Sequence, residues 1–351
     1  MIKEQFNKAM HYSRKFLFSP DCALNYFRFL ASKSKVRVRH SPVNVICYVT
    51  DKCNLRCSMC LRNMEKFSDL QHNKIQDMTP DTFKEILNIF KSPASFSFIG
   101  QGEPLLNNDV FKMIDLANRM RKETTLFTNG VLLNMEKINM VLNYGLRKIN
   151  ISLYGVDEEE FGSVTGANKA IFHEVIRNID NLVKQKRKSR SHIKISISYL
   201  CTKDNYKNME RIIALGQGLR LDHIYFNNLI PEDILSERGR QKLFFEGDKE
   251  IIDTFGSLKQ RYKDLRFSLP IVLKRQQHKR YCPFYYRSIS VDAAGNVAGC
   301  CNILNPHKKY GNIFKDKDIY NGEHFLQTRE MFLNRDKDLP LYCKLCPELS
   351  R

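Results

Sequence analysis

The chain has 351 residues, of which 42% are hydrophobic, enough for one large or two unequal domains with a sizeable core. Lys and Arg outnumber Asp and Glu by 57 to 38, and the formal net charge of +19 favours anionic ligands without selecting among them. Neither a membrane-spanning apolar run nor the apolar core of a signal peptide is found, so we expect a cytoplasmic protein without a transmembrane segment. No nucleic-acid-binding motif is present, and no nucleic acid is expected as a partner.

Residues 1–42 are predicted to form a basic helical N-terminal extension. Apolar residues from Phe6 to Leu30 recur at roughly helical spacing, with Lys and Arg between them. One interpretation is one or two helices packed on the outside of the main domain. The other is an amphipathic helix that touches a membrane surface.

The first predicted strand leads into a cysteine loop. Residues 43–50 alternate and are rich in β-branched side chains, and Cys53, Cys57 and Cys60 follow directly. A [4Fe–4S] cluster is usually held by four thiolates, so three thiolates leave one iron open to another ligand. A zinc site is the alternative, but His40 and His72 are not at zinc-finger spacing.

Strands and helices then alternate, which is typical of an α/β domain with a parallel sheet. We assign residues 43–231 to this domain. Its predicted strands are 43–50, 96–99, 124–128, 148–153, 192–200 and 223–229, with helices at 81–90, 134–142 and 170–186. Polar and glycine-rich segments follow several of these strands, at the edge where barrel enzymes place their chemistry.

The spacing C-x3-C-x2-C after a short strand resembles the signature of the radical S-adenosylmethionine (radical SAM) enzymes. The segment after the second strand resembles that family's GGEP motif, with a glutamine at its second position. The resemblance implies a partial (β/α)6 barrel of the TIM type. It also implies that SAM binds the open iron and that one electron cleaves SAM to a 5′-deoxyadenosyl radical. The SAM contacts that it implies are Gly100, Gln101, Gly102, Glu103, Pro104, Asn129, Ser152 and Lys169.

Two of these residues have particular predicted roles. Glu103 would add negative charge near the SAM ammonium group. Lys169 would replace the arginine that contacts the SAM carboxylate in relatives. The chain departs from the family at Met59, where an aromatic residue is usual, and at Tyr154, where an acidic residue is common.

The C-terminal part carries a second cysteine set. Residues 232–278 are interpreted as a helical bridge, and residues 279–351 as a small domain with a β-hairpin turning at 292–296 and a helix at 319–333. Its ligands would be Cys282, Cys300, Cys343 and Cys346, with Cys301 as an alternative to Cys300. The spacing resembles the twitch or SPASM domain of radical SAM enzymes and implies a second [4Fe–4S] cluster. A structural zinc site is the alternative.

We therefore predict a radical SAM oxidoreductase, of the dehydrogenase or epimerase type, with two [4Fe–4S] clusters. Its substrate would be a small polar molecule: a sugar, an aminocyclitol or a nucleotide-linked sugar. The alternatives are a maturase that modifies a precursor peptide or a protein, and a non-catalytic metal-binding adaptor. An electron donor such as flavodoxin or ferredoxin would reduce the first cluster.

Residues at the ends of the fifth and sixth strands complete the predicted site. Cys201 closes the fifth strand and is either a hydrogen-atom donor to a substrate radical or a small buried residue. Tyr199, Asn227 and Asn228 are predicted to face the substrate.

Overall fold

The computed structural model describes residues 20–32, 35–63, 76–229, 240–274, 280–298, 300 and 310–350. Within this part, one curved sheet runs in the order β7-β6-β5-β4-β3-β2-β1-β8-β9. Each neighbouring pair is parallel except β8 and β9, which are antiparallel. The strands are β1 (Asn44–Tyr48), β2 (Ser95–Ile99), β3 (Glu123–Thr128), β4 (Lys148–Ser152), β5 (Lys194–Cys201), β6 (His223–Asn228), β7 (Phe267–Ser268), β8 (Ser288–Val291) and β9 (Val297–Ala298).

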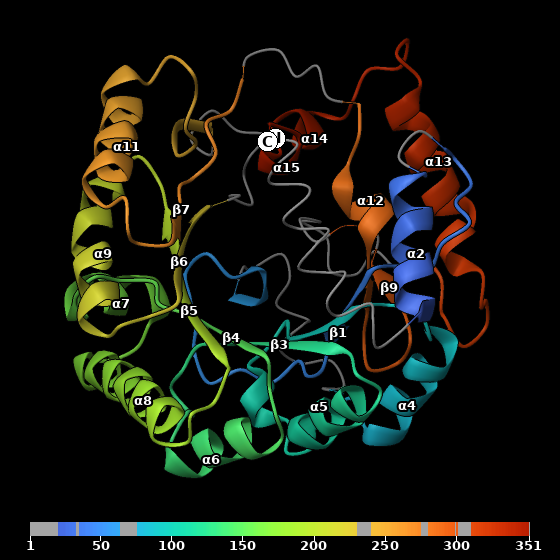
Figure 1. The fold of residues 1–351 in the computed structure, drawn as a ribbon. Helices are drawn as coiled ribbons and strands as arrows, with labels where there is room; N and C mark the ends of the chain where they lie inside the picture. Colours follow the sequence, from blue (N-terminus) through green and yellow to red (C-terminus); the bar gives the residue numbers. More distant parts are fainter. Residues whose placement is uncertain are drawn as a thin grey trace.

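Helices cover the convex side of this sheet and leave the concave side facing the interior of a partial barrel (Figure 1). The predicted α/β class and partial TIM-type barrel are thus confirmed. The helices are α2 (Pro20–Leu30), α4 (Pro80–Ile89), α5 (Val110–Arg119), α6 (Met135–Asn143), α7 (Glu158–Thr165), α8 (Lys169–Lys188), α9 (Met209–Gly218), α11 (Lys249–Arg261), α12 (Pro283–Arg287), α13 (Glu323–Leu333), α14 (Leu341–Lys344) and α15 (Pro347–Ser350).

Side-chain caps set where several of these helices begin. Thr79 accepts a hydrogen bond from the Thr82 amide at the start of α4. Asn134, Asp157 and Asn168 cap α6, α7 and α8 in the same way. Each cap satisfies a backbone N–H that has no partner within its helix, so the strand-to-helix turns are defined locally.

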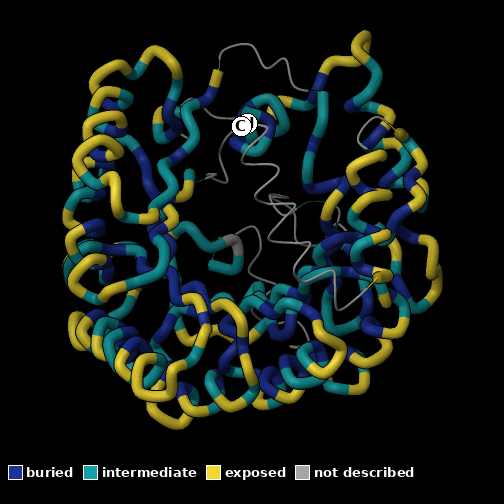
Figure 2. Tube along the Cα trace, viewed as in Figure 1, coloured by how far each residue is buried: buried dark blue, intermediate teal, exposed yellow. Residues whose placement is uncertain are grey.

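The two faces of the sheet differ in polarity because successive strand residues point to opposite sides. In β5, Ile195 and Ile197 are buried in the apolar core, whereas Ser196 and Ser198 line a cavity on the concave face. Buried positions follow the strands, and exposed positions lie mainly on the outer helices (Figure 2). The core lies between sheet and helices, so the concave face is left for polar groups.

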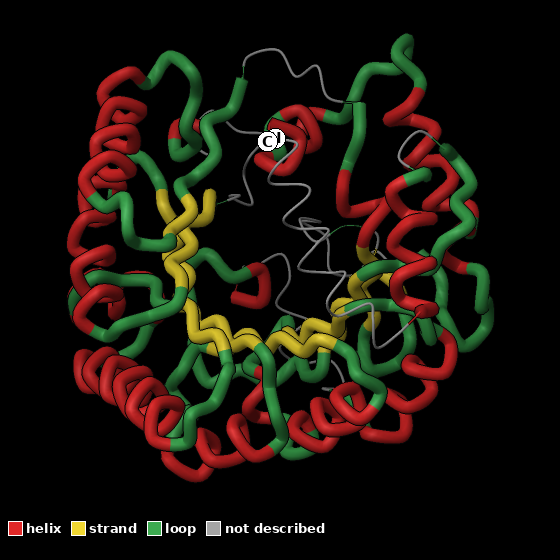
Figure 3. The backbone as a smooth tube through the Cα atoms, viewed as in Figure 1, coloured by secondary structure: helices red, strands yellow, loops and turns green. Residues whose placement is uncertain are grey.

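Two segments extend the sheet beyond the six predicted strands, as Figure 3 shows. β7 comes from the stretch interpreted as a helical bridge and pairs with β6. β8 pairs with β1 in parallel, so the C-terminal hairpin continues the barrel sheet. The described residues of β8 are all buried, which suits a strand covered on both faces. The domain boundaries given above remain predictions.

The N-terminal extension is described only from residue 20. Helix α2 buries Cys22, Asn25 and Phe29, and Asn25 donates from Nδ2 to the Ser41 carbonyl at 3.1 Å. This agrees with a helix packed on the outside of the main domain. The apolar positions of the extension before residue 20 lie outside the described residues. Among the described helices, none has both the length and the apolar character needed to cross a bilayer.

Asp222 joins the amino ends of β5 and β6 to the end of α8. Its carboxylate accepts hydrogen bonds from the Ile195 amide at 2.8 Å, from Lys186 Nζ at 2.6 Å and from Lys194 Nζ at 3.2 Å. Burial acts to raise the pKa of Asp222, but the hydrogen bonds from Ile195 and Lys186 outweigh it and hold the pKa below its ordinary value. Asp222 therefore stabilises the fold above its unfolded pKa of about 3.9.

We expect Asp222→Asn to lower the free energy of unfolding at pH 7 by about 1–3 kcal/mol, as for a lost charged hydrogen-bond partner. The difference from wild type should shrink as the pH falls through the lowered pKa, because the carboxylate is then protonated in both states. Urea unfolding of both proteins at several pH values from 7 to about 3 measures this difference in the free energy of unfolding. The exposed Asp264→Asn is the control, and equal losses in both variants would contradict the assignment.

Candidate functional site

The first cysteine loop follows β1, and its three thiols lie within electrostatic reach of one another. The pKa of Cys57 is raised to about 12, by burial first and then by the nearby thiols of Cys60 and Cys53. The pKa of Cys53 is also raised, by burial first and then by Glu103 and Cys60. The described residues contain no three His, Cys, Asp or Glu side chains already arranged around a metal position. Three thiols facing one region still fit a cluster with one open iron.

The end of helix α7 holds this loop in place. The Arg56 amide donates to the Thr165 carbonyl at 3.1 Å, and the Ser58 amide donates to the Val164 carbonyl at 2.8 Å. The loop thus uses carbonyls that a helix C-terminus leaves without intrahelical partners. Sequence analysis missed this support, because the residues are about a hundred positions apart and the contact uses backbone atoms.

The glycine-rich loop after β2 packs directly on the entry to the cysteine loop. The Glu103 amide donates to the Lys52 carbonyl at 2.6 Å, and the Gly102 amide donates to the Thr50 carbonyl at 3.2 Å. A Cβ atom on Gly102 would overlap the Lys52 carbonyl oxygen, so this contact requires glycine. Gly100 and Gln101 lie half-buried just before it.

Glu103 is buried and fully engaged in hydrogen bonds, and its predicted role near the SAM ammonium group stays a prediction. Its side chain is 2% exposed, and its carboxylate accepts from the Leu105 amide at 3.0 Å, Thr128 Oγ1 at 2.7 Å and the Asn129 amide at 2.7 Å. Burial raises the pKa of Glu103. Glu103 therefore fastens the glycine-rich loop to the end of β3, and the buried Pro104 begins a single 3-10 turn there.

Asn129 and Ser152 lie close to the cysteine loop. Asn129 donates from Nδ2 to Asn54 Oδ1 at 2.8 Å. Ser152 ends β4, and Tyr154 follows two residues later, where burial and the nearby thiols of Cys57 and Cys60 raise its pKa. The structure thus gathers the ends of β3 and β4 around the first cysteine set. Tyr154 also lies near the first cysteine set, whereas the sequence analysis noted it only as a departure from the family pattern.

Lys169 pairs with two carboxylates on the surface, and its predicted contact with the SAM carboxylate stays a prediction. Its ammonium group donates to Glu158 at 3.1 Å and to Glu159 at 3.0 Å, and its side chain is 64% exposed. Two carboxylates already neutralise this ammonium on the outer surface, where α7 and α8 meet.

The second cysteine set is brought together from three segments. The pKa of Cys282 is raised to about 12, mainly by burial and to a lesser extent by the Cys300 and Cys346 thiols. The pKa of Cys343 is raised by burial and then by Cys300, Cys282 and Cys346. The four predicted ligands therefore lie within electrostatic reach of one another, and four thiolates are the donor set that a [4Fe–4S] cluster usually takes. The alternative ligand, Cys301, lies outside the described residues.

Cys201 and Tyr199 point away from the concave face. In β5 they alternate with Ser196 and Ser198, so they lie on the helix side, where they are 1% and 0% exposed. Tyr199 donates to Glu160 of α7 at 2.5 Å, and burial followed by Glu160 raises the pKa of Cys201. This placement corrects both predictions: neither residue reaches the concave face, and the buried interpretation of Cys201 holds.

The two asparagines at the end of β6 have separate places. Asn227 lines the cavity on the concave face. Asn228 donates to the Ile271 carbonyl and accepts from the Ile271 amide, both at 2.8 Å. Asn228 thus has a structural role beside β7, and Asn227 stays a candidate for substrate contact.

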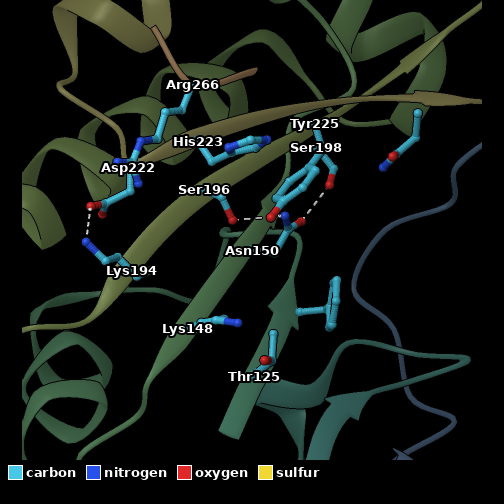
Figure 4. A pocket seen from close by; sticks show the side chains of 12 residues that line it. Thr125, Lys148, Asn150, Lys194, Ser196, Ser198, Asp222, His223, Tyr225 and Arg266 are labelled. Carbon is cyan, nitrogen blue, oxygen red and sulfur yellow. Dashed lines mark hydrogen bonds and ion pairs between the residues drawn. The ribbon is translucent and has the colours of Figure 1, made fainter. Parts of the chain in front are cut away.

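A cavity of about 360 Å³ extends along the concave face of β3 to β6 (Figure 4). Asn150 donates to Ser196 Oγ at 3.0 Å, and Ser198 donates to Asn150 Oδ1 at 2.7 Å, so hydroxyl and amide groups form its floor. The polar lining of this cavity was not predicted from the sequence, although polar residues at alternate strand positions were the available signal. Its lining residues are Thr125, Phe127, Lys148, Asn150, Lys194, Ser196, Ser198, Asp222, His223, Tyr225, Asn227 and Arg266.

Family models match both halves of this arrangement. The radical SAM superfamily matches residues 47–216, and an iron-sulfur cluster-binding domain matches residues 282–347. Among curated proteins, GTP 3',8-cyclase of Clostridium perfringens is 35% identical over 39% of this chain and 43% of its own length. The chain therefore aligns with less than half of that relative. The tungsten-containing aldehyde ferredoxin oxidoreductase cofactor-modifying protein of Pyrococcus furiosus is 25% identical over 81% of this chain and 78% of its own.

Solved structures share the fold at lower identity. SuiB of Streptococcus suis, bound to its precursor peptide SuiA, is 15% identical over 87% of this chain and 70% of its own, with a TM-score of 0.66. The enzyme anSMEcpe with bound AdoMet is 17% identical over 84% of both chains, with a TM-score of 0.61. At these identities the likeness concerns the fold.

We expect Gly102→Ala to separate the glycine-rich loop from the cysteine loop. The added methyl group must displace the Lys52 carbonyl, at a cost of about 1–3 kcal/mol, as for overpacking elsewhere in proteins. The reconstituted variant should retain less iron per chain and melt at a lower temperature than wild type. Iron analysis and thermal unfolding measure both effects.

The matched control is Gly256→Ala in helix α11, where an added Cβ has no neighbour within 4 Å. Alanine there should raise stability by about 0.5–1 kcal/mol, because glycine is unfavourable inside a helix. Normal iron content in Gly102→Ala would show that the two loops do not depend on each other.

Proposed function

We propose that this chain, which matches the radical SAM superfamily over residues 47–216 and an iron-sulfur cluster-binding domain over residues 282–347, is a radical SAM oxidoreductase acting on a polar, hydroxyl-bearing substrate. The observation that carries the proposal is the cavity on the concave face. Its floor consists of Asn150, Ser196 and Ser198, whose hydroxyl and amide groups can exchange hydrogen bonds with a sugar or a nucleotide-linked sugar. The rings of Phe127 and Tyr225 add the apolar surface on which a sugar face or a base can pack.

The residues of this chain would have two separate roles, the binding of the cofactors and the positioning of the substrate. Cys53, Cys57 and Cys60 would hold the first cluster, with Gly100, Gln101, Gly102, Asn129 and Ser152 around the SAM position. When bound, the cluster and SAM supply the radical that removes a hydrogen atom from substrate. The protein's contribution is to hold the reacting carbon in place and to exclude water.

The second cysteine set gives the substrate radical a route to lose an electron. Cys282, Cys300, Cys343 and Cys346 can bind every iron of a [4Fe–4S] cluster, so such a cluster would transfer electrons and would bind no substrate. Loss of one electron and one proton after hydrogen abstraction completes a two-electron oxidation. The buried Cys201 takes no part in this proposal.

Modification of a precursor peptide is the second candidate function. It is favoured by the shared fold with SuiB, whose structure was solved with its precursor peptide. A non-catalytic adaptor is a lesser alternative and requires that SAM is not cleaved. A cytoplasmic location and a reductant such as flavodoxin or ferredoxin belong to the same proposal, and the net charge of +19 would attract an acidic electron donor.

Cysteine variants test the assignment of the two clusters. After anaerobic reconstitution, wild type should bind about eight irons, from two four-iron clusters, and produce 5′-deoxyadenosine on reduction. Cys57→Ala should bind about four and cleave no SAM, since removing a ligand opens the first cluster. Cys343→Ala should also bind about four but keep SAM cleavage. Iron analysis and chromatography of 5′-deoxyadenosine measure these outcomes.

Cys201→Ala is the control and should match wild type in iron content and SAM cleavage. SAM cleavage by Cys57→Ala would contradict the first assignment, and full iron content in Cys343→Ala would contradict the second. Wild type that binds iron but never cleaves SAM would favour the adaptor. Incubation with nucleotide-linked sugars and, separately, with short peptides then decides between the two enzymatic candidates.

A further inference from the structure

The cavity has two chemically different ends. Because strand residues alternate, its lining forms rows across the sheet: Thr125 pairs with Lys148 and Lys148 with Lys194 in the row nearest the amino ends. Ser198 pairs with Tyr225 in a row nearer the carboxyl ends, and Asn227 lies beyond that row in β6. The amino end therefore carries charge, and the opposite end carries hydroxyl groups.

Positive charge predominates at the amino end. Lys148, Lys194 and Arg266 line it together with a single carboxylate, Asp222, which is shared between Lys194 and Lys186. Figure 4 shows the Arg266 side chain extending toward Asp222 and His223. The amino end of a barrel usually serves stability, so an excess of cations beside a cavity is unexpected there.

Arg266 is the cation whose hydrogen-bond donors remain available to a ligand. Lys148 is paired with Glu123 at 2.8 Å, and Lys194 with Asp222 at 3.2 Å. Among the described residues, the structure gives the Arg266 side chain no hydrogen bond or ion pair, although it lies near enough to His223 to help lower that pKa, after burial. A guanidinium group has five N–H donors suited to an oxyanion.

We propose that Arg266, with Lys194 and Lys148 beside it, forms a subsite for a terminal oxyanion of the substrate, either a phosphate or a carboxylate. This inference rests on the proposed function, since it names the substrate group that enters the same cavity. It goes beyond that function by placing a binding determinant at the end of the barrel opposite the cysteine loop.

The length of the cavity then limits the substrate. Lys194 and Ser198 both line the cavity and are four residues apart in β5, which corresponds to about 13 Å at roughly 3.3 Å per residue. Ser198 pairs with Ser152, and Tyr154, two residues further along the chain, lies within electrostatic reach of Cys57 and Cys60, so this row marks the reactive end. A substrate that reaches both ends must be about 13 Å long. A free monosaccharide or aminocyclitol is too short, whereas a nucleotide-linked sugar or an extended peptide with a carboxylate is long enough.

Titration calorimetry on the full-length reconstituted protein at low salt tests the subsite. Inorganic pyrophosphate probes for a phosphate and succinate for a carboxylate. Wild type should bind at least one of them, and Arg266→Gln should weaken that binding roughly tenfold or more, since a charged hydrogen-bond partner is lost. Arg266→Lys should recover part of the affinity, because the charge remains but the planar fork does not.

Two further variants make the result specific. Lys263→Gln removes the same charge from an exposed position outside the cavity and should change the affinity less than twofold. Asp222→Asn removes the competing carboxylate and should tighten binding severalfold. If wild type binds pyrophosphate more tightly than succinate, the subsite is assigned to a phosphate. If it binds succinate more tightly than pyrophosphate, the subsite is assigned to a carboxylate.

The subsite is overturned if wild type binds neither probe, or if Arg266→Gln and Lys263→Gln weaken binding equally. Circular dichroism of each variant checks that it is folded. SAM cleavage by wild type, measured in parallel, tests the proposed function separately. Probe binding without SAM cleavage would support the subsite and contradict the radical function. SAM cleavage without probe binding would support the radical function and contradict the subsite.

Discussion

The backbone contact between the loop after β1 and the loop after β2 is the interaction on which the site depends. The amides of Gly102 and Glu103 donate to carbonyls of the cysteine-loop entry, and no side chain fits between the two loops. The buried Glu103 carboxylate then joins this pair of loops to the end of β3. Three successive strand ends therefore behave as one rigid unit, and the cysteine loop inherits its position from them.

The parallel sheet explains why such a unit can form. All strands from β1 to β6 run the same way, so their carboxyl ends meet at one edge and residues far apart in sequence become neighbours there. The same geometry gathers the amino ends at the opposite edge, where Asp222 and several cations lie. The concave face between them is polar because the apolar half of each strand is used to bind the helices.

The C-terminal strand β8 links the two cysteine sets. By pairing in parallel with β1, it fixes the second set relative to the strand that leads into the first. Sequence reasoning treated this hairpin as part of a separate small domain, because its turn residues and cysteine spacing are local signals. Pairing between β1 and β8 joins segments more than two hundred residues apart, and no local pattern encodes it.

The order of the elements and the chemistry of the ligands can be read from the sequence. Alternation predicted the six strands and three of the helices between them, and cysteine spacing predicted two thiol sets, whose members lie within electrostatic reach of one another. The tertiary structure determines where individual side chains point. It turned Cys201 and Tyr199 into the core, buried Glu103 and engaged Lys169 on the surface. The physical reason is that the face on which a strand residue lies, and the partner that its charge meets, depend on strand register and on residues distant in sequence.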